Sequence, residues 1–194
     1  MLRILKYPHP ALRHKSKPLR RVDNELKNTV REMFEAMYEN KGIGLAANQV
    51  NLPYRVFILN TEGDPEKGEE LVFLNPEILK RGGGVVEADE GCLSFPEIYA
   101  PVKRSAKIVI AAYDLDGEQV TYELSGLAAR GAQHENDHLD GVLFIDRLTP
   151  TGLLSIKESL VELEREFAGD RQRGIIPDDR QIASRLAELE SLRT

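Results

Sequence analysis

The sequence lacks the features that would place it in a membrane, in an oxidising compartment or on a nucleic acid. No apolar run approaches the roughly 18 to 20 residues that cross a bilayer, and the N-terminus reaches Pro8 and Pro10 without an apolar signal core. The single cysteine, Cys92, excludes an internal disulfide and fits a reducing compartment. The net charge of -6 comes without a basic cluster, so we expect no direct nucleic-acid binding and a cytoplasmic location.

Length and composition predict one globular domain. The 194 residues are enough for one well-buried core but few for two full domains. Hydrophobic residues at 41% and charged residues at 30% fall in the ordinary range for folded, water-soluble chains. The sequence contains no internal repeat or low-complexity tract, and residues 62–70, rich in glycine, proline and charge, are expected to form a flexible loop.

Apolar residues recur at spacings of three and four in several segments, as on one face of a helix. The first segment follows Asp23 and is expected to end near Gly42. The second is expected to begin after Ser125, which can cap a helix, and to run to Leu139. Two further helical segments follow Pro150 and a possible capping box of Asp178 and Gln181.

Strands are predicted between the first two helices, where β-branched and aromatic residues gather. The runs are residues 55–60, 71–74, 107–113 and 119–124, and Asp116 with Gly117 predicts a hairpin between the last two. The predicted fold class is α+β, with small antiparallel sheets packed around a central helix, residues 125–139, and with a C-terminal helix.

Two histidines four residues apart, His134 and His138, are the clearest chemical signal in the sequence. On a helix both imidazoles lie on one face, one turn apart, and can bind one metal ion. Glu135 is turned about 100° from His134 and can lie beside the ion, which suits a general base acting on water there. A chance occurrence of this short pattern is the alternative, but Leu127 and Ala128 indicate a buried helix, where such a polar cluster needs a partner.

A catalytic metal site with two histidines usually needs a third protein ligand. No histidine follows His138, and His9 and His14 lie in a proline-rich, basic segment where we expect them at the surface. Cys92 is therefore the better candidate, although a buried cysteine that packs as a small apolar residue is a common alternative.

Three motifs together resemble the peptide deformylase family. They are Gly-Ile-Gly-Leu-Ala-Ala-Asn-Gln at residues 42–49, Glu-Gly-Cys-Leu-Ser at residues 90–94, and His-Glu-Asn-Asp-His at residues 134–138. Their order and spacing agree with that family over about half the chain. The resemblance implies a hydrolase of protein biosynthesis that removes the N-formyl group from N-formylmethionine of new proteins and releases formate. It also implies a catalytic domain, which we place at residues 1–168. The C-terminal extension at residues 169–194 is expected to be partly helical from the spacing of Ile182, Leu186 and Leu189, the alternative being a mobile tail.

The resemblance also implies roles for individual residues. In this family the motif cysteine and two histidines bind the metal, which here gives Cys92, His134 and His138. Glu135 would be the acid and base of catalysis, while the backbone N–H of Leu93 and the side-chain amide of Gln49 would stabilise the oxyanion. The expected substrate-binding residues are Ile43, Gly44, Glu90 and Leu127.

The implied cofactor is one divalent metal ion. Sulfur and imidazole ligands alone would favour zinc, but the resemblance implies Fe2+ in the native enzyme, with Zn2+, Ni2+ or Co2+ possible in purified protein. The implied partners are nascent formyl-Met polypeptides at the ribosome of a bacterial cytoplasm, with no nucleic acid and no membrane.

The chain departs from the family pattern at several positions. Arg130 and Gly131 stand where bulky apolar residues usually line the methionine pocket, and Asn136 stands where an apolar residue is common. Asn51 stands where glycine often follows the first motif and could alter the local turn. We also hypothesise a direct contact between Glu90 and Arg104, the alternative being two unrelated surface charges.

Two other functions compete with this interpretation. A zinc endopeptidase would share the chemistry of the metal site but would cleave internal peptide bonds and would not need Cys92 as a ligand. A binding module that kept the fold and lost turnover would hydrolyse no formyl-Met peptide. The complete set of Cys92, His134, Glu135, His138 and Gln49 argues against the second alternative.

Overall fold

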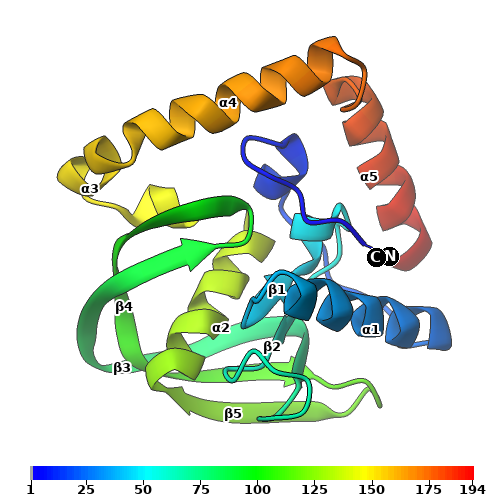
Figure 1. Ribbon diagram of the computed structural model, residues 1–194. Helices are drawn as coiled ribbons and strands as arrows, with labels where there is room; N and C mark the ends of the chain where they lie inside the picture. The colour runs from blue at the N-terminus through cyan, green and yellow to red at the C-terminus, as the bar shows by residue number, and fades with distance from the viewer. Residues whose placement is uncertain (1) are drawn as a thin grey trace.

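A computed structural model describes residues 2–194 and shows one antiparallel sheet around a central helix (Figure 1). The strands follow one another across the sheet in chain order, each antiparallel to the next. The α+β class is confirmed, and the strands that we expected in small sheets share a single sheet. The strands are β1 (Gly44–Ala46), β2 (Val56–Leu59), β3 (Leu71–Cys92), β4 (Phe95–Tyr113) and β5 (Gln119–Ser125).

Five α-helices and three short 3-10 helices complete the described part of the chain. The helix α2 lies in the concave side of the curved sheet, while α4 and α5 form an outer arm (Figure 1). The α-helices are α1 (Asn24–Glu39), α2 (Gly126–Leu139), α3 (Pro150–Ser155), α4 (Lys157–Gln172) and α5 (Asp179–Arg193). The 3-10 helices are η1 (Pro10–Arg13), η2 (Ala47–Val50) and η3 (Phe144–Arg147).

The hairpin of β3 and β4 is much longer than the sequence predicted. Residues 71–74 pair with β2, and residues 107–113 lie between β3 and β5, so the two predicted runs are the parts that join this hairpin to the other strands. Residues 85–92 of β3 and 95–105 of β4 pair only with each other among the described strands, as a two-stranded ribbon, and most of the β3 side chains in it are exposed. Such residues lack the buried pattern by which a strand is recognised, because neither face of the ribbon is fully covered.

Glycines bend the ribbon over α2. The register of β3 against β4 shifts between Gly82 and Val85, and Gly83 and Gly84 have φ of 71° and 77°, values that L side chains rarely adopt. A bulge of this kind bends a strand and increases its twist. The end of the hairpin, where Cys92 lies, is thereby brought toward α2 (Figure 1).

The helix α2 is buried at Ala129 and from Gly131 to Leu139, and it packs on four of the five strands. Ser125 occupies the N-cap position as expected, although its side chain makes no capping hydrogen bond. The expectation of a substantially buried helix is confirmed, although Leu127, on which it partly rested, is itself 51% exposed. Burial begins about half a turn later, where the helix passes under the ribbon.

The first helix agrees with the prediction. The Asp23 side chain accepts a hydrogen bond from the backbone N–H of Leu26 at 2.9 Å, which caps α1 at its N-terminus. The apolar face of α1 packs on the short strands β1 and β2, and the chain leaves the helix through Lys41, which has a φ of 56°. This packing fixes the segment after Gly42, which carries the first motif.

The C-terminal region forms three helices. The helix expected after Pro150 is divided at Ile156 into α3 and α4, and the predicted domain boundary at residues 168 and 169 falls within α4. The capping box of Asp178 and Gln181 is confirmed at the start of α5. Ile182 and Leu186 of α5 pack on Ala11, so the extension lies against the N-terminal segment; the division into two domains stays a prediction.

Two further features of the chain concern its loops and helices. Residues 62–70 form the expected loop, which Asn60 holds by donating hydrogen bonds to the carbonyls of Asp64 and Lys67. Within residues 2–194, none of the helices combines the length and the apolar character needed to cross a bilayer.

The close contact at the end of α2 predicts a stability difference between two glycine variants. Gly141 has a φ of 72°, and a Cβ there would lie 2.5 Å from the carbonyl oxygen of Arg13; Gly174 has the same φ but nothing within 4 Å. Gly174→Ala should therefore cost only the strain of the left-handed backbone, about 1 kcal/mol, and lower the Tm by roughly 2 to 4 °C. Gly141→Ala should cost about 2 to 3 kcal/mol, measured by calorimetry at equal metal content. Equal shifts would contradict the contact.

Candidate metal centre

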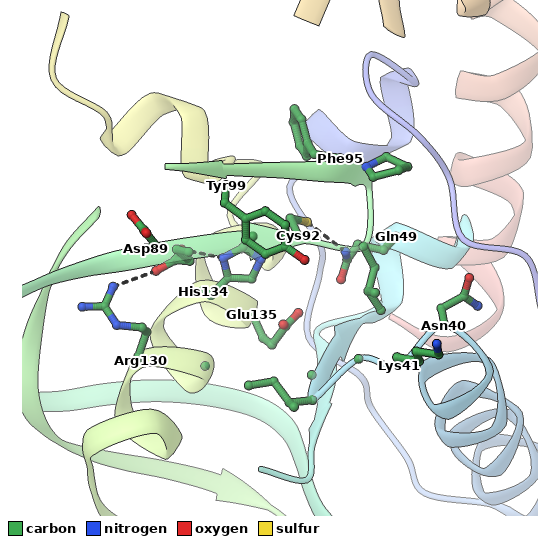
Figure 2. Close-up of a pocket in the computed structure, with 18 of the residues that line it drawn as sticks. Asn40, Lys41, Gln49, Asp89, Cys92, Phe95, Tyr99, Arg130, His134 and Glu135 are labelled. Atoms are coloured by element: carbon green, nitrogen blue, oxygen red, sulfur yellow. Dashed lines mark hydrogen bonds and ion pairs between the residues drawn. The ribbon is translucent and has the colours of Figure 1, made fainter. Parts of the chain in front are cut away.

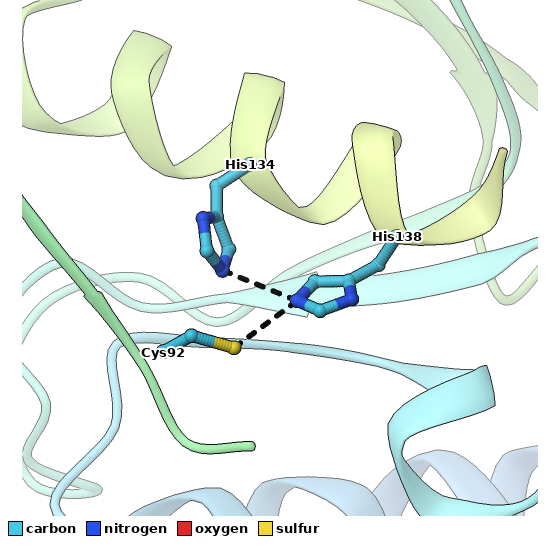
Figure 3. A group of neighbouring side chains, drawn as sticks. All are labelled: Cys92, His134 and His138. Atoms are coloured by element: carbon cyan, nitrogen blue, oxygen red, sulfur yellow. Dashed lines mark hydrogen bonds between the residues drawn. The ribbon is translucent and has the colours of Figure 1, made fainter. Parts of the chain in front are cut away.

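Three potential metal ligands converge between the hairpin and α2. Cys92 ends β3 just before the turn into β4, and His134 and His138 lie one turn apart on α2. The Sγ of Cys92 lies 3.2 Å from Nε2 of His138, which in turn lies 3.2 Å from Nε2 of His134 (Figure 3). All three potential ligand atoms lie within 4.8 Å of one another.

The donor atoms fit a tetrahedral metal ion. Bonds of about 2.0 to 2.3 Å to nitrogen and sulfur would separate the donors by roughly 3.3 to 3.6 Å, close to the two distances observed. One thiol and two imidazoles are also a donor set that zinc and ferrous iron accept. The two Nε2 atoms face each other, an arrangement that a cation between them explains better than packing does.

Glu90 fixes the orientation of His134. Its Oε1 lies 2.6 Å from Nδ1 of His134, and because a carboxylate only accepts hydrogen bonds, this nitrogen carries the proton. The lone pair of Nε2 is then free to face the metal site. Burial raises the pKa of the Glu90 carboxyl, but hydrogen bonds from His134 and Arg104 outweigh burial and hold the pKa well below its usual range.

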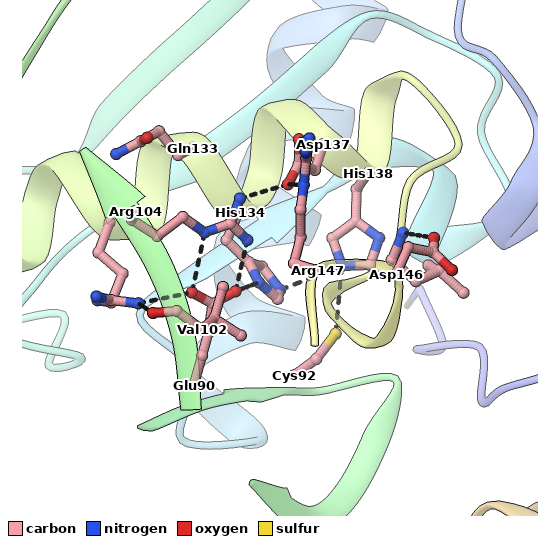
Figure 4. A network of polar contacts seen from close by, with 12 residues as sticks. Glu90, Cys92, Val102, Arg104, Gln133, His134, Asp137, His138, Asp146 and Arg147 are labelled. Carbon is pink, nitrogen blue, oxygen red and sulfur yellow. Dashed lines mark hydrogen bonds and ion pairs between the residues drawn. The ribbon is translucent and has the colours of Figure 1, made fainter. Parts of the chain in front are cut away.

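The hypothesised contact between Glu90 and Arg104 is observed. Arg104 donates to both carboxylate oxygens, from Nη2 at 2.6 Å and from Nε at 3.1 Å (Figure 4). It also pairs with Asp137 of α2, which accepts from Nη2 and Nε of Arg147 at 2.6 and 3.1 Å. The side chains of Glu90, Arg104 and Asp137 are buried, so each needs these partners to offset the loss of water.

Glu135 lies beside the cluster with one oxygen unpartnered. Its residue is 4% exposed, and among the described residues its Oε2 has no hydrogen-bond partner. Burial raises the pKa of this carboxyl to about 7, while the neighbouring His134 lowers it. A Cβ on Gly44 would lie 2.6 Å from Oε1, so the carboxylate reaches this position only because residue 44 is glycine.

Gln49 is held with its amide nitrogen toward the cluster. Its Oε1 accepts a hydrogen bond from the backbone N–H of Ala46 at 2.8 Å. Nε2 accordingly faces the other way, 3.2 Å from Oγ of Ser94 and 3.4 Å from Sγ of Cys92. Leu93 stands in the turn between β3 and β4, next to the cysteine.

A cleft of about 570 Å³ opens over these residues. Figure 2 shows its walls, with His134 and Glu135 on α2, and Cys92 and Tyr99 on the hairpin. Of the residues that we expected at the site, all except His138, which lies deeper, line this cleft. They are Ile43, Gly44, Gln49, Glu90, Cys92, Leu93, Leu127, His134 and Glu135.

Several other lining residues were not predicted from the sequence. Tyr99 covers Gly91, where a Cβ would lie 2.5 Å from the ring, and 67% of Tyr99 is exposed toward the cleft side of the hairpin. Asn40, Lys41 and Phe95 also line the cleft (Figure 2). Their positions depend on the bend of the ribbon and the exit from α1, which no local pattern predicts.

The departures from the family pattern have different structural outcomes. Gly131 is required by packing, since a Cβ there would lie 2.8 Å from a methyl group of Leu59. Asn136 does not line the cleft, and its amide points toward Asp140. Asn51 has a φ of 63°, a conformation that asparagine tolerates, so the turn that glycine would form is kept. Arg130 does line the cleft.

The expectation that both N-terminal histidines lie at the surface is wrong for His9. His9 is buried, its Nδ1 accepts a hydrogen bond from the N–H of Ala11, and its ring packs edge-on against Phe167. Burial lowers the pKa of His9 to about 4. His14 is half-buried with its Nε2 2.7 Å from Glu190, and the metal-ligand cluster found among residues 2–194 includes neither histidine.

Comparisons with known proteins agree on one family. The family model described as polypeptide deformylase matches residues 1–153. A peptide deformylase from Rhodopirellula baltica is 44% identical over 193 residues, which cover 100% of this chain and 96% of the relative. The chloroplastic and mitochondrial peptide deformylase 1B of Arabidopsis thaliana is 48% identical over 166 residues, 86% of this chain and 61% of the relative.

Solved structures are similar over most of the chain. A crystal structure of the plant peptide deformylase PDF1B has a TM-score of 0.86 and 46% identity, and the match covers 92% of this chain and 95% of that one. The crystal structure of peptide deformylase from Thermotoga maritima has a TM-score of 0.73 and 43% identity, and the match covers 77% of this chain and 99% of that one.

The convergence of three donors predicts one tightly bound divalent ion per chain. Cys92→Ala and His138→Ala should each lower the affinity for Co2+ by at least about 100-fold, because each removes one of three protein ligands. Isothermal titration with Co2+ of the metal-stripped protein measures this. His14→Gln, which changes a histidine outside the cluster, is the control and should bind as the wild type does. Unchanged Co2+ affinity in Cys92→Ala would exclude the cysteine as a ligand.

Proposed function

The chain belongs to the peptide deformylase family, whose members hydrolyse the N-formyl group of N-terminal formyl-methionine in new proteins and release formate, and we propose how its residues perform this reaction. The observation that carries the proposal is the cluster of Cys92, His134 and His138 beside the buried carboxylate of Glu135. These side chains come from the hairpin and α2 and face the same cleft, or lie directly beneath it.

Cys92, His134 and His138 would hold the metal ion through Sγ and the two Nε2 atoms. Bound there, the ion would polarise the formyl oxygen and lower the pKa of a water molecule. Glu90 keeps the proton of His134 on Nδ1, away from the metal side. We assign Glu90 this positioning role in place of the substrate contact expected from the sequence, because its two oxygens are occupied by His134, Arg104 and Arg130.

Glu135 is the proposed acid and base. Its raised pKa, about 7 before any cation is considered, means that the carboxylate can take a proton and return it near neutral pH. The unpartnered Oε2 takes the proton of the attacking water as a C–O bond forms at the formyl carbon. When the C–N bond breaks, the same oxygen delivers the proton to the amine of the methionine, and formate leaves.

Leu93 and Gln49 are the proposed oxyanion donors. The hydrogen bond from Ala46 holds the Gln49 oxygen, so the two Nε2 hydrogens face Oγ of Ser94 and Sγ of Cys92. The hydrogen that faces the sulfur would turn to the formyl oxygen when the substrate binds. The backbone N–H of Leu93 lies in the adjacent turn. Donors of this kind typically contribute about 2.7 to 4 kcal/mol each to transition-state stabilisation.

Substrate binding is assigned to the apolar wall and floor of the cleft. Ile43 and Leu127 would contact the methionine side chain, and the high exposure of Leu127 in the free chain leaves apolar surface for the substrate to cover. Gly44 lets a peptide backbone and the Glu135 carboxylate approach the same point. We infer that nascent chains meet the enzyme at the ribosome, in a bacterial cytoplasm.

The native ion is proposed to be Fe2+. Zinc suits the donor set equally well, so the proposal rests on the family resemblance, and Zn2+, Ni2+ or Co2+ could replace iron in purified protein. Protein purified without oxygen should contain about one iron per chain, and exposure to air should inactivate it as iron and thiolate are oxidised. Metal analysis before and after aeration measures both, with the Co2+-loaded enzyme as an air-stable comparison. Zinc alone in the anaerobic sample would contradict the assignment.

Formate release from a formyl-Met peptide tests the reaction and the role of Glu135. The metal-loaded wild type should turn over, a chelator should stop it, and Glu135→Gln should lower kcat by about 10² to 10⁴-fold while keeping the metal, because the proton acceptor is lost. Glu158→Gln, on the exposed face of α4, is the matched control and should have wild-type activity. Cleavage of internal peptide bonds would favour an endopeptidase. Formate release by the wild type that is no faster than that of Glu135→Gln would favour a binding module.

A further inference from the structure

Arg130 is a charged residue in the wall of the cleft, one turn before His134 on α2. A cation at this place would be costly in an apolar pocket. Its side chain is 13% exposed and therefore largely removed from water. Such a residue requires acceptors for its donors, and those acceptors indicate what it does.

The guanidinium of Arg130 contacts both strands of the hairpin. Nη1 donates to Oε2 of Glu90 at 3.1 Å and to the carbonyl of Val102 at 3.0 Å, and Nη2 donates to the carbonyl of Val86 at 2.8 Å. Val86 and Glu90 belong to β3, and Val102 belongs to β4. Figure 2 shows the guanidinium directed toward this part of the hairpin and away from Glu135, so the methionine pocket adjoins the methylene stem.

These contacts join the two elements that carry the metal ligands. The acceptors all lie beyond the glycine bulge, in the ribbon where β3 and β4 pair only with each other among the described strands. Cys92 is two residues after Glu90, whereas His134 and His138 are on α2. A side chain that ties α2 to this ribbon therefore fixes the distance between the sulfur and the two imidazoles.

Arg130 also completes the contacts of Glu90. Oε1 of Glu90 accepts from His134 and Arg104 at 2.6 Å each, and Oε2 accepts from Arg104 and Arg130 at 3.1 Å each. With both oxygens held, the carboxylate cannot rotate away from Nδ1 of His134. Partners of a metal ligand at this distance affect metal affinity by about 10 to 100-fold when they are removed.

We propose that Arg130 is a positioning residue of the metal centre, which sets metal affinity by clamping the Cys92 hairpin to α2 and by holding Glu90 on His134. The inference rests on the proposed ligand set of Cys92, His134 and His138. Arg130 does not contact the substrate through its charge, because its guanidinium donates to hairpin acceptors. A merely structural arginine would stabilise the fold without setting the affinity for the ion.

Titration of the metal-stripped protein with Co2+ tests the proposal. Arg130→Met keeps the apolar stem and removes the donors, and it should weaken Co2+ binding by about 10 to 100-fold. Arg130→Lys keeps the charge and one donor group, and it should restore part of the affinity. Arg165→Met, an exposed arginine of α4, is the matched control for the loss of one positive charge and should bind Co2+ as the wild type does.

Two further measurements separate positioning from folding and from substrate binding. At saturating Co2+, the KM of Arg130→Met for a formyl-Met peptide should stay within about twofold of the wild-type value, because the methionine pocket keeps its apolar wall. In a double-mutant cycle on Co2+ affinity, Arg130→Met and Glu90→Gln should be less than additive, since Arg130 acts partly through Glu90.

Wild-type Co2+ affinity in Arg130→Met would overturn the proposal, and full additivity with Glu90→Gln would exclude the path through Glu90. If Arg130→Met does not fold, Arg130→Lys carries the test, and wild-type affinity in that variant overturns the proposal as well. Metal binding is measured without turnover, so a failure of the proposed reaction can be distinguished from a failure of the proposed role of Arg130. A wild-type chain that binds Co2+ but releases no formate counts against the reaction and not against the role of Arg130.

Discussion

The carboxylate of Glu90 is the group on which the arrangement of the metal centre depends. It is buried, it carries a negative charge, and it accepts hydrogen bonds from His134, Arg104 and Arg130. These donors come from α2 and β4, while Glu90 itself stands on β3 two residues before Cys92. The Glu90 side chain therefore sets the tautomer of His134, a proposed metal ligand. It also sets the distance between β3, which carries Cys92, and α2, which carries His134 and His138.

A network of charged side chains extends from this carboxylate to Arg147, whose side chain is half-exposed. Arg104 pairs with Glu90 and Asp137, and Asp137 pairs with Arg147 of η3 (Figure 4). Glu90 also pairs with Arg130 of α2, so two acids and three arginines join the hairpin to the helices. Such a network adds little to stability compared with apolar packing, but the loss of Arg104, which both acids share, would leave each of these buried carboxylates with fewer donors and would be destabilising. The network therefore selects one arrangement of the site over others.

The sequence could predict the cluster of Cys92, His134 and His138, with Glu135 beside it, because metal-site chemistry constrains residue type and spacing. His134, Glu135 and His138 fix their own geometry once they are placed on a helix, and the contact of Glu90 with Arg104 was expected from the family pattern. The long ribbon, the burial of His9 and the lining position of Tyr99 could not be predicted. Each depends on contacts between segments far apart in the chain, which no local periodicity records.

The ribbon has a thermodynamic consequence for the metal. Beyond Gly84 its two strands have no third strand beside them among the described residues, and Cys92 lies at its far end. An ion bound to Cys92, His134 and His138 would cross-link this end to α2, so occupation of the site and docking of the ribbon are reciprocally coupled. A shift of the ribbon away from α2 would therefore lower the affinity for the ion. Release of the ion would in turn loosen the ribbon, which forms one wall of the peptide cleft.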